Sequence, residues 1–258
     1  MSESLAVSID GPTANVRLNR PIVRNALDGD LIAALTKAFL DFHARAELRA
    51  VLLEGAGAIF CGGADIQYMR KALDLDEQQN YEDALRLSDL FAAIDDCPIP
   101  TIAKVQGAAL GGGAGLVAAC DIVIAADDAL FGFTEAKLGI VPAVISPFVV
   151  RKIGAGHARA LFTTAERFSA ERALRIGLVH EMVPPSQLDA STDGKMREVL
   201  TSGPTAARMA KKIAKTAAQL ERDEARSWTA RQIAQQRVGP EGQEGLRSFL
   251  EKRRPDWH

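Results

Sequence analysis

The sequence has little cysteine and no excess of charge of either sign, and both absences narrow the classes of protein that it can encode. Only three cysteines, Cys61, Cys97 and Cys120, occur in 258 residues. None belongs to a CxxC pair, so we expect a reducing compartment rather than a disulfide framework. The 31 lysines and arginines nearly balance the 33 aspartates and glutamates. We therefore expect no strongly basic nucleic-acid-binding surface.

Long apolar runs are absent as well. No stretch approaches the roughly 18 apolar residues that a membrane-spanning helix needs. The first ten residues, MSESLAVSID, have neither the basic start nor the apolar centre of a signal peptide. We therefore expect a cytoplasmic protein without a membrane partner, and the length suffices for one large domain, or one with a small appendage, around a sizeable core.

Motifs of several common chemistries are also missing. No GxxxxGK[ST] phosphate loop occurs, and the string GGGAGL from Gly111 departs from the dinucleotide-binding pattern at its last position. There is no GxSxG nucleophile elbow. The four histidines show no HxxxH spacing, so no metal site is expected. Cys61 is a conceivable nucleophile, but a small buried core thiol is the favoured interpretation.

Apolar periodicity predicts an α/β body followed by a helical C-terminal part. Asp28 is the expected cap of a helix that runs to about Ala46. Strand, glycine-rich loop, helix and strand succeed one another over residues 101–128, which is the pattern of a parallel sheet. The polar segment 71–80 is expected to be a mobile surface stretch. Further strands are expected at 5–10, 14–20, 49–55, around 129–133 and at 178–184, and helices at 81–95, 155–165, 169–176, 185–201, 204–220 and 223–237.

The boundary between the two parts is expected between residues 190 and 204. We divide the chain into a core of residues 1–195 and a helical oligomerisation region of residues 196–258.

The segment Gly107–Asp121, GAALGGGAGLVAACD, carries five glycines in its first nine residues. Glycine loses the most backbone freedom on folding, so such a cluster must meet a local requirement. The first N–H groups of a helix are unpaired and partly positive, and a glycine there lets a carbonyl oxygen approach, as in half of an oxyanion hole. The turn CGGADI, from Cys61 to Ile66, also follows a strand and is a candidate for the other half. A tight turn that only packs a strand on a helix stays open as an alternative.

One carboxylate stands out, Glu135 in the string FGFTEAKLGIVPA. Burial among apolar neighbours would raise its pKa, as a general acid or base near neutrality requires. The alternative is a solvent-facing glutamate paired with Lys137. The residues alone do not choose between the two.

Four separated motifs, in order, resemble the enoyl-CoA hydratase/isomerase (crotonase) superfamily: CGGADI, IPTIAKVQGAALGGG, ACDIVIAADDALFGFTEAKLGIVP and FSAERALRIGLVHEMVP. The resemblance runs from about residue 5 to the C-terminus. It implies an α/β fold, a crotonase-like spiral of ββα units with a helical C-terminal trimerisation region. It also implies a homotrimer or a hexamer (a dimer of trimers) and an acyl-CoA thioester as substrate. Coenzyme A is then part of the substrate, and no separate cofactor is needed.

The resemblance also implies roles for particular residues. The amides of Ala64 and Gly112 would hold the oxygen of a thioester enolate, and Glu135 would be the catalytic acid or base. Arg24 would approach the phosphates of coenzyme A. The other residues expected to line the substrate are Gly62, Asp65 and Ile66 on the adenine and pantetheine side, then Gly111, and Met69, Phe133 and Phe148 around the acyl group. Phosphate contacts, also across a subunit boundary, are further expected from Lys211, Lys212 and Lys215.

The sequence departs from the superfamily at Gly115, where hydratases carry the first of two glutamates. One hypothesis is a hydratase for a branched or glutaconyl-like acyl group, because the string VPAVISPFVVRKIG resembles the bacterial methylglutaconyl-CoA hydratase subgroup. The second is a Δ3,Δ2-enoyl-CoA isomerase, which needs one carboxylate. The third is a crotonase-fold decarboxylase or a non-catalytic scaffold that binds coenzyme A or RNA. Retention of Glu135 argues against the scaffold.

Overall fold

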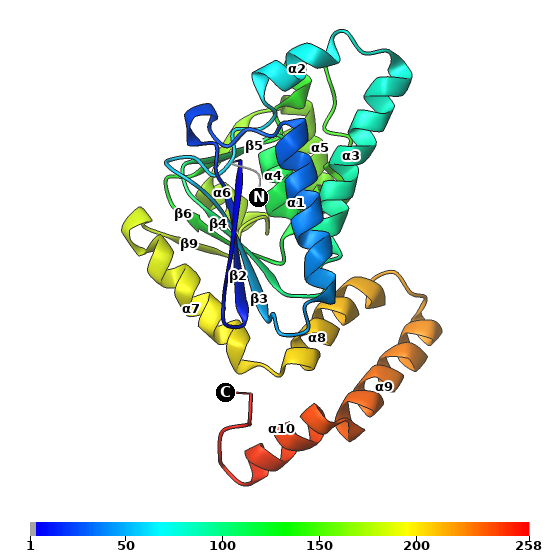
Figure 1. Cartoon of the computed structure of the whole chain (residues 1–258). Helices are drawn as coiled ribbons and strands as arrows, with labels where there is room; N and C mark the ends of the chain where they lie inside the picture. The colour runs from blue at the N-terminus through cyan, green and yellow to red at the C-terminus, as the bar shows by residue number, and fades with distance from the viewer. Residues whose placement is uncertain (1–3, 258) are drawn as a thin grey trace.

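Six strands form the larger sheet of the computed structural model, which describes residues 4–257 (Figure 1). Their order is β1-β2-β3-β4-β6-β9. The first two are an antiparallel hairpin, and every later pair is parallel. The bounds are β1 (Leu5–Asp10), β2 (Thr13–Leu18), β3 (Ala50–Gly55), β4 (Thr101–Val105), β6 (Ile122–Ala126) and β9 (Glu181–Val183).

A smaller sheet of three short strands lies beside the glycine-rich segment. Its order is β5-β7-β8, with β5 parallel to β7 and β7 antiparallel to β8. The expected strand near 129–133 is confirmed as β7, whereas β5 and β8 were not expected, because three residues are too few to show alternation. The bounds are β5 (Ala108–Leu110), β7 (Leu130–Gly132) and β8 (Arg167–Ser169).

Helices cover both faces of the larger sheet. In Figure 1, α7 lies on one side of the strands and α1 and α3 lie on the other. Strand β3 is buried along its whole length, as expected for a parallel strand covered on both faces. The helix bounds are α1 (Gly29–Asp41), α2 (Ile66–Ala72), α3 (Glu77–Asp95), α4 (Gly112–Ala119), α5 (Ser146–Thr164), α6 (Ala170–Arg175), α7 (Leu188–Thr201), α8 (Pro204–Ala217), α9 (Arg222–Val238) and α10 (Pro240–Leu250).

Several local predictions are confirmed and others are corrected. Asp28 caps α1 by accepting a hydrogen bond from the Leu31 amide at 2.9 Å. The stretch over residues 71–80 lies on the surface, as expected, but helices were missed there, because α2 ends at Ala72 and α3 begins at Glu77 behind a capping box. In that box the Asp76 and Gln79 side chains bond reciprocally to the backbone, which fixes the start of α3.

Helix α5 begins earlier than expected, and α10 was not expected at all. The sequence predicted that this helix begins near residue 155. In the structure, Gly154 interrupts α5 just before that point with a φ of 77°. The division at residue 195 falls inside α7, which packs against β3, β4 and β6. The turn at residues 202–203 is therefore the nearest break in the fold, and it lies within the predicted interval of 190–204.

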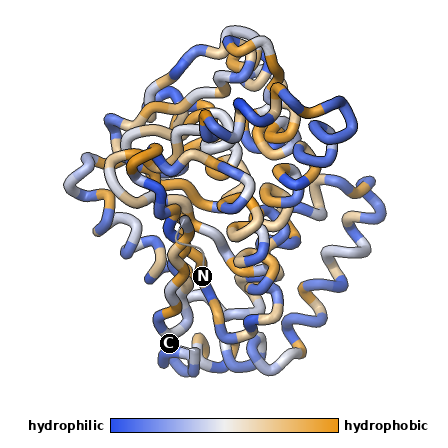
Figure 2. Tube along the Cα trace, turned by 45° about the horizontal axis from the view of Figure 1, so that its top comes forward, coloured by the Kyte–Doolittle hydropathy of each residue, from blue (hydrophilic) through white to orange (hydrophobic). Residues whose placement is uncertain are grey.

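The C-terminal helices α8, α9 and α10 extend away from the sheets (Figure 1). Figure 2 shows hydrophobic segments gathered in the body and mainly hydrophilic residues along these helices. Arg49, just before β3, donates hydrogen bonds to the carbonyls of Leu200, Ser202 and Trp257, and so ties this region to the body. No helix among residues 4–257 is both long and apolar enough to cross a membrane.

A buried carboxylate links three strands of the larger sheet to α7. Glu54 on β3 is 1% exposed and accepts hydrogen bonds from Arg17 (2.7 Å) and Asn15 (3.0 Å) on β2. It also pairs with Lys104 on β4, which reaches Asp189 on α7 at 2.8 Å. Burial by itself would raise the pKa of Glu54, but the hydrogen bonds from Lys104, Asn15 and Arg17 outweigh it and lower the pKa. The carboxylate is therefore ionised in the folded state at neutral pH.

We expect Glu54→Gln to lower the free energy of unfolding by about 3 kcal/mol at pH 7, because Lys104 and Arg17 lose a buried anionic partner. The folded-state pKa of Glu54 is lowered, so this contribution is present above the unfolded pKa of about 4.3 and fades as the pH falls through the folded pKa. Urea unfolding at pH 7 and at pH 4 measures both effects. Glu171→Gln, which removes an exposed pair with Arg175, is the control and should cost less than about 1 kcal/mol. Equal losses in the two variants would contradict the prediction.

Candidate active site

Two loops are held side by side by backbone hydrogen bonds at the predicted oxyanion site. The Leu27 amide donates to Gly63 O, and the Asp65 amide donates to Leu27 O, both at 2.8 Å. These bonds make a short parallel bridge between Leu27 and Ala64. In such a bridge the N–H of Ala64 points away from Leu27. No acceptor for this amide is found among residues 4–257, so the Ala64 N–H is free to meet a substrate oxygen.

The glycine-rich segment packs against the same turn from the other side. The Cys61 amide donates to the Ala108 carbonyl, and the Leu110 amide donates to the Cys61 carbonyl, both at 3.0 Å, in a parallel bridge between Cys61 and Ala109. A Cβ on Gly113 would lie 2.6 Å from the Cys61 carbonyl oxygen, so only glycine allows this approach. Gly112 is the first residue of α4, where helical N–H groups have no partner within the helix. The predicted donors Ala64 and Gly112 therefore lie on adjacent loops.

Glu135 lies beside the start of α4. It is the first residue of the short 3-10 helix η3 (Glu135–Leu138), which follows β7. A Cβ on Gly111 would be 3.4 Å from the Glu135 Oε1 atom, which places the carboxylate next to the predicted donor Gly112. The other oxygen, Oε2, is buried and has no hydrogen-bond partner among the described residues.

Burial raises the pKa of Glu135 above its ordinary value, although a backbone hydrogen bond opposes the shift. Lys137 is exposed, and Glu135 forms no ion pair within residues 4–257. The pairing with Lys137 that the sequence left open is therefore wrong. A partly buried carboxyl group without an ion-pair partner among the described residues, whose Oε2 atom lacks a hydrogen bond there, suits proton transfer.

Gly115 on α4 has no room for a side chain. A Cβ there would lie 2.4 Å from Cγ2 of Ile145 and 2.9 Å from two ring atoms of Phe91. Both neighbours are buried and apolar. The position to which the superfamily resemblance assigns the first of the two hydratase glutamates is therefore closed by hydrocarbon in this chain.

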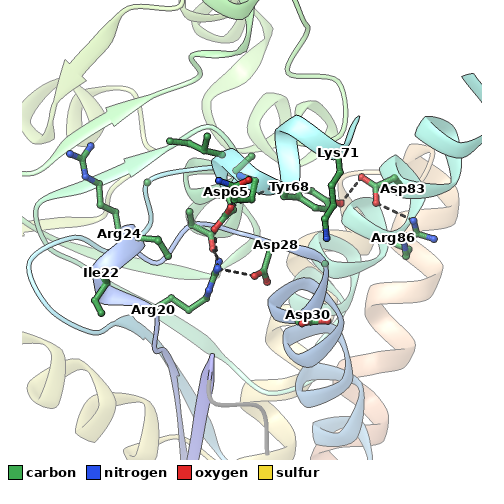
Figure 3. A pocket seen from close by; sticks show the side chains of 17 residues that line it. Arg20, Ile22, Arg24, Asp28, Asp30, Asp65, Tyr68, Lys71, Asp83 and Arg86 are labelled. Carbon is green, nitrogen blue, oxygen red and sulfur yellow. Dashed lines mark hydrogen bonds and ion pairs between the residues drawn. The ribbon is translucent and has the colours of Figure 1, made fainter. Parts of the chain in front are cut away.

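A cavity of about 890 Å³ opens beside the Ala64 turn (Figure 3). Five of the predicted site residues line it: Arg24, Gly62, Ala64, Asp65 and Ile66. The other polar lining residues were not predicted: Arg20, Asp28, Asp30, Gln67, Tyr68, Lys71, Asp83 and Arg86.

Of the groups predicted to act on the thioester, Ala64 lines this cavity, whereas Gly112 and Glu135 do not. Gly111, Gly112 and Glu135 are not among the residues that line it. The link is Gly63, which stands between Gly62 and Ala64 in the chain. A Cβ on Gly111 would be 3.9 Å from the Cα atom of Gly63. Gly63 and Gly111 therefore lie between the lining of this cavity and the Glu135 carboxylate.

The aromatic residues expected around the acyl group are buried. Phe133 is fully buried, and its ring packs on those of Phe162 and Phe168 at centroid distances of 5.2 and 5.7 Å. It therefore packs in the core and is not among the residues that line this cavity, so its expected place around the acyl group stays a prediction. Met69 is half-buried on α2 and lies outside the cavity lining. Phe148 is buried beside Phe91, with ring centroids 5.8 Å apart.

Two of the lysines expected to be spare for phosphate contacts are already paired within the chain. Lys211 pairs with Asp121 at 2.7 Å, and Lys215 pairs with Asp95 at 2.5 Å. They are therefore not spare in the single chain, and their expected phosphate role stays a prediction. The spacing in sequence gave no sign of these partners, because each lies about 90 residues or more away.

The Cys61 thiol was the other candidate nucleophile in the sequence, and metal binding was the other chemistry weighed there. Burial raises the pKa of the Cys61 thiol to about 12, so this thiol stays protonated and packs as a core residue. Among residues 4–257, no group of three or more histidine, cysteine or acidic side chains is arranged to hold a metal ion.

Comparison with known proteins identifies the family of this chain. Residues 9–258 match the Enoyl-CoA hydratase/isomerase family model, and the chain belongs to that family. It is similar to the short-chain-enoyl-CoA hydratase of Clostridium acetobutylicum, at 31% identity over 95% of this chain and 94% of the relative. An enoyl-CoA hydratase structure from Shewanella pealeana is 37% identical, with a TM-score of 0.94 over 98% of this chain and 96% of that one. AtuE from Pseudomonas aeruginosa is 35% identical, with a TM-score of 0.96 over 99% of both chains.

The class of protein follows from these relationships. The chain has the mixed α/β crotonase fold with a helical C-terminal region, and it is an enoyl-CoA hydratase or isomerase that acts on acyl-CoA thioesters. The superfamily resemblance is confirmed. Its acyl group, its catalytic residues and its assembly are taken up below.

We expect Glu135→Gln to raise the free energy of unfolding at neutral pH. The folded pKa of Glu135 is raised, so wild-type stability is greatest below the unfolded pKa of about 4.3 and falls as the pH rises through the folded value. Glutamine does not titrate. The difference between variant and wild type should therefore grow from about pH 4 upward and then level off, in urea unfolding at a series of pH values. A difference that shrinks as the pH rises would contradict the burial of an unpartnered carboxyl group.

Proposed function

We propose that the protein adds water to a 2-enoyl-CoA thioester with Glu135 as its one catalytic carboxylate. The observation that carries the proposal is the buried Oε2 atom of Glu135, without a partner among the described residues, beside the start of α4. The amides of Ala64 and Gly112 are the proposed donors to the thioester oxygen. Each fixed donor to a developing oxyanion is worth about 2.7–4 kcal/mol.

One carboxyl group can carry out the whole hydration. Glu135 accepts a proton from water as the water oxygen forms its bond to C3. The π electrons of the C2–C3 double bond move onto the thioester oxygen, which the two amides hold as an enolate. The enolate then takes the proton from Glu135 at C2 and the carboxylate is restored. A pKa raised towards neutrality suits a group that must both accept and donate.

A Δ3,Δ2-enoyl-CoA isomerase is the second candidate, and the surroundings of Gly115 favour it. That reaction moves one proton between C2 and C4 and needs no bound water. Ile145 and Phe91 make this side of the site apolar, so it offers a water molecule no hydrogen bond. The decarboxylase hypothesis has no comparable support, because decarboxylation leaves the buried carboxyl group of Glu135 without a task.

A branched or glutaconyl-like acyl group is the finer part of the proposal. The string that resembles the methylglutaconyl-CoA hydratase subgroup contains Ile145, the residue that fills the space at Gly115. A distal carboxylate on such a substrate would supply the second acidic group that the chain lacks. Arg24 on the cavity edge is proposed to meet the phosphates of coenzyme A, with Gly62, Asp65 and Ile66 along the adenine and pantetheine (Figure 3).

Assembly as a homotrimer or a hexamer is also proposed. Large apolar side chains on the extended C-terminal helices are exposed in the single chain, and association of copies would cover them. They include Val238 (79% exposed), Phe249 (80%) and Leu250 (78%).

The reaction is tested by the mass of the products formed from a panel of acyl-CoA thioesters. We expect a gain of one water with 2-enoyl substrates, faster with a glutaconyl-type than with a crotonyl-type chain. Glu135→Gln should lower kcat about 10²–10⁴-fold while the substrate still binds, because the proton carrier is lost and the shape is kept. Unchanged mass with a shifted double bond would favour the isomerase, and loss of CO2 the decarboxylase. Undiminished turnover by Glu135→Gln would remove the catalytic assignment, and equal or faster turnover of crotonyl-CoA would remove the glutaconyl one.

The assembly is tested by sedimentation equilibrium. We expect a mass of three or six times the 27.6 kDa of the chain. Phe249→Glu should shift the distribution towards smaller species, because a charge in an apolar contact is poorly tolerated. His157→Gln, on the exposed part of α5, is the matched control and should leave the mass unchanged. A wild-type protein that stays monomeric at micromolar concentration would contradict the proposal.

A further inference from the structure

Arg20 is the one guanidinium in the cavity that contacts both loops of the bridge at Ala64. It stands between β2 and the 3-10 helix η1 (Pro21–Val23). Its Nη1 atom donates to the Ala26 carbonyl at 2.5 Å, and Nη2 lies 2.8 Å from Asp28 Oδ2 and 2.9 Å from Asp65 Oδ2. Figure 3 shows the guanidinium between the two carboxylates.

The contacts of Arg20 fall on opposite sides of the Leu27–Ala64 bridge. Ala26 and Asp28 flank Leu27 on one loop, and Asp65 follows Ala64 directly on the other. The two oxygens of Asp65 are divided between two tasks, since Oδ1 caps α2 by accepting from the Gln67 amide at 2.8 Å while Oδ2 meets Arg20. Asp65 is thus held through both carboxylate oxygens, and its own amide donates to Leu27 O across the bridge beside Ala64.

The base of the same loop is held independently of Arg20. Asn25 is fully buried, and its Nδ2 atom donates to the carbonyls of Ala56 and Ile59 at 2.8 and 2.7 Å. Its Oδ1 atom accepts from the Arg20 backbone amide at 2.9 Å, a contact that any residue at position 20 other than proline can make. Loss of the Arg20 side chain would therefore loosen the contact between the two loops while the base stays anchored.

We propose that Arg20 is a positioning residue for the Ala64 donor: its guanidinium clamps Asp28, Ala26 and Asp65 so that the Ala64 N–H faces the thioester oxygen. The inference rests on the proposed function, because it assumes that Ala64 is a donor. Charge-assisted hydrogen bonds from a planar fork hold geometry better than a lysine ammonium can. Misplacement of a catalytic group by about 1 Å can cost on the order of 10²-fold in rate.

The experiment compares Arg20→Gln with wild type in kinetics and in the binding of two ligands. One ligand is a saturated acyl-CoA thioester and the other is the alkyl thioether of coenzyme A, which lacks the carbonyl oxygen. Wild type should bind the thioester more tightly than the thioether. In Arg20→Gln we expect kcat to fall about 10–100-fold and the preference for the thioester to disappear, with thioether affinity unchanged. Arg20→Lys should restore only part of kcat and of the preference.

Two further variants guard against a merely structural explanation. Asp28→Asn keeps a good cap for α1 but removes one anionic partner of Arg20, so a smaller loss of the same kind is expected. Arg172→Gln breaks an ion pair with Glu166 that lies outside the cavity lining and should change neither kcat nor the preference. If Arg20→Gln does not fold, Asp28→Asn and Arg20→Lys carry the same readouts.

Three outcomes would overturn the inference. The first is an Arg20→Gln or Asp28→Asn variant that keeps the thioester preference and the wild-type kcat. The second is a variant that loses thioether binding and thioester binding equally, which indicates general collapse of the cavity. The third is a wild-type protein without any thioester preference, which removes the proposed donors themselves and so shows that the proposed function, not the role of Arg20, has failed.

Discussion

Close contact between three backbone loops is the constraint on which the site depends. The loops at residues 24–28, 61–65 and 107–113 meet through short hydrogen bonds and through positions where a Cβ cannot fit. At Gly107 an added Cβ would lie 2.1 Å from the Ala58 carbonyl oxygen, and φ is +64°, so the glycine is required twice over. Because the loops touch backbone to backbone, the sheets behind them hold the amides of Ala64 and Gly112 in place, and Arg20 braces the loop contact beside Ala64. Preorganised donors of this kind need no rearrangement when charge develops on the substrate.

The same packing explains how a carboxyl group can stay buried without a partner. Glu135 is held against glycines at the start of α4, where no side chain competes for its oxygens. Burial of such a group lowers the stability of the folded state, and the packing of the rest of the protein offsets that loss. Glu54 is the counter-example in the same protein, because its carboxylate is more fully buried but meets Arg17, Lys104 and Asn15, which lower its pKa. The partners of the two glutamates, rather than burial alone, therefore decide the direction of each pKa shift.

Local pattern was enough to predict the parts of the fold that local pattern determines. The parallel strands around the glycine-rich segment and the Asp28 cap follow from residues within a few positions of each other. The residues of the capping box at Asp76 are also adjacent in sequence, but the polar composition of their segment favoured a surface loop over a helix start. Partners far apart in sequence could not be predicted: Arg20 meets Asp65 45 positions away, and Lys215 meets Asp95 120 positions away. The burial of Phe133 among Phe162 and Phe168 has the same origin, because the three rings come from separate elements.

The proposed reaction therefore depends on the packing of Ile145 against Gly115 and not on the identity of residue 115 alone. In the sequence, Gly115 indicates only the loss of a carboxylate. In the structure, a Cβ atom at position 115 would lie 2.4 Å from Cγ2 of Ile145, so the first carbon of any side chain would clash there. Restoring a glutamate at 115 without shortening Ile145 would overpack a core that already includes Phe91, and overpacking displaces neighbours rather than creating a water site. Ile145 is also the residue that precedes α5, so its displacement would move the start of that helix. The apolar wall is a property of the packing between α3, α4 and the start of α5. The absence of a carboxylate at position 115 is therefore built into this packing, and the proposed reaction depends on Glu135 as its one proton carrier.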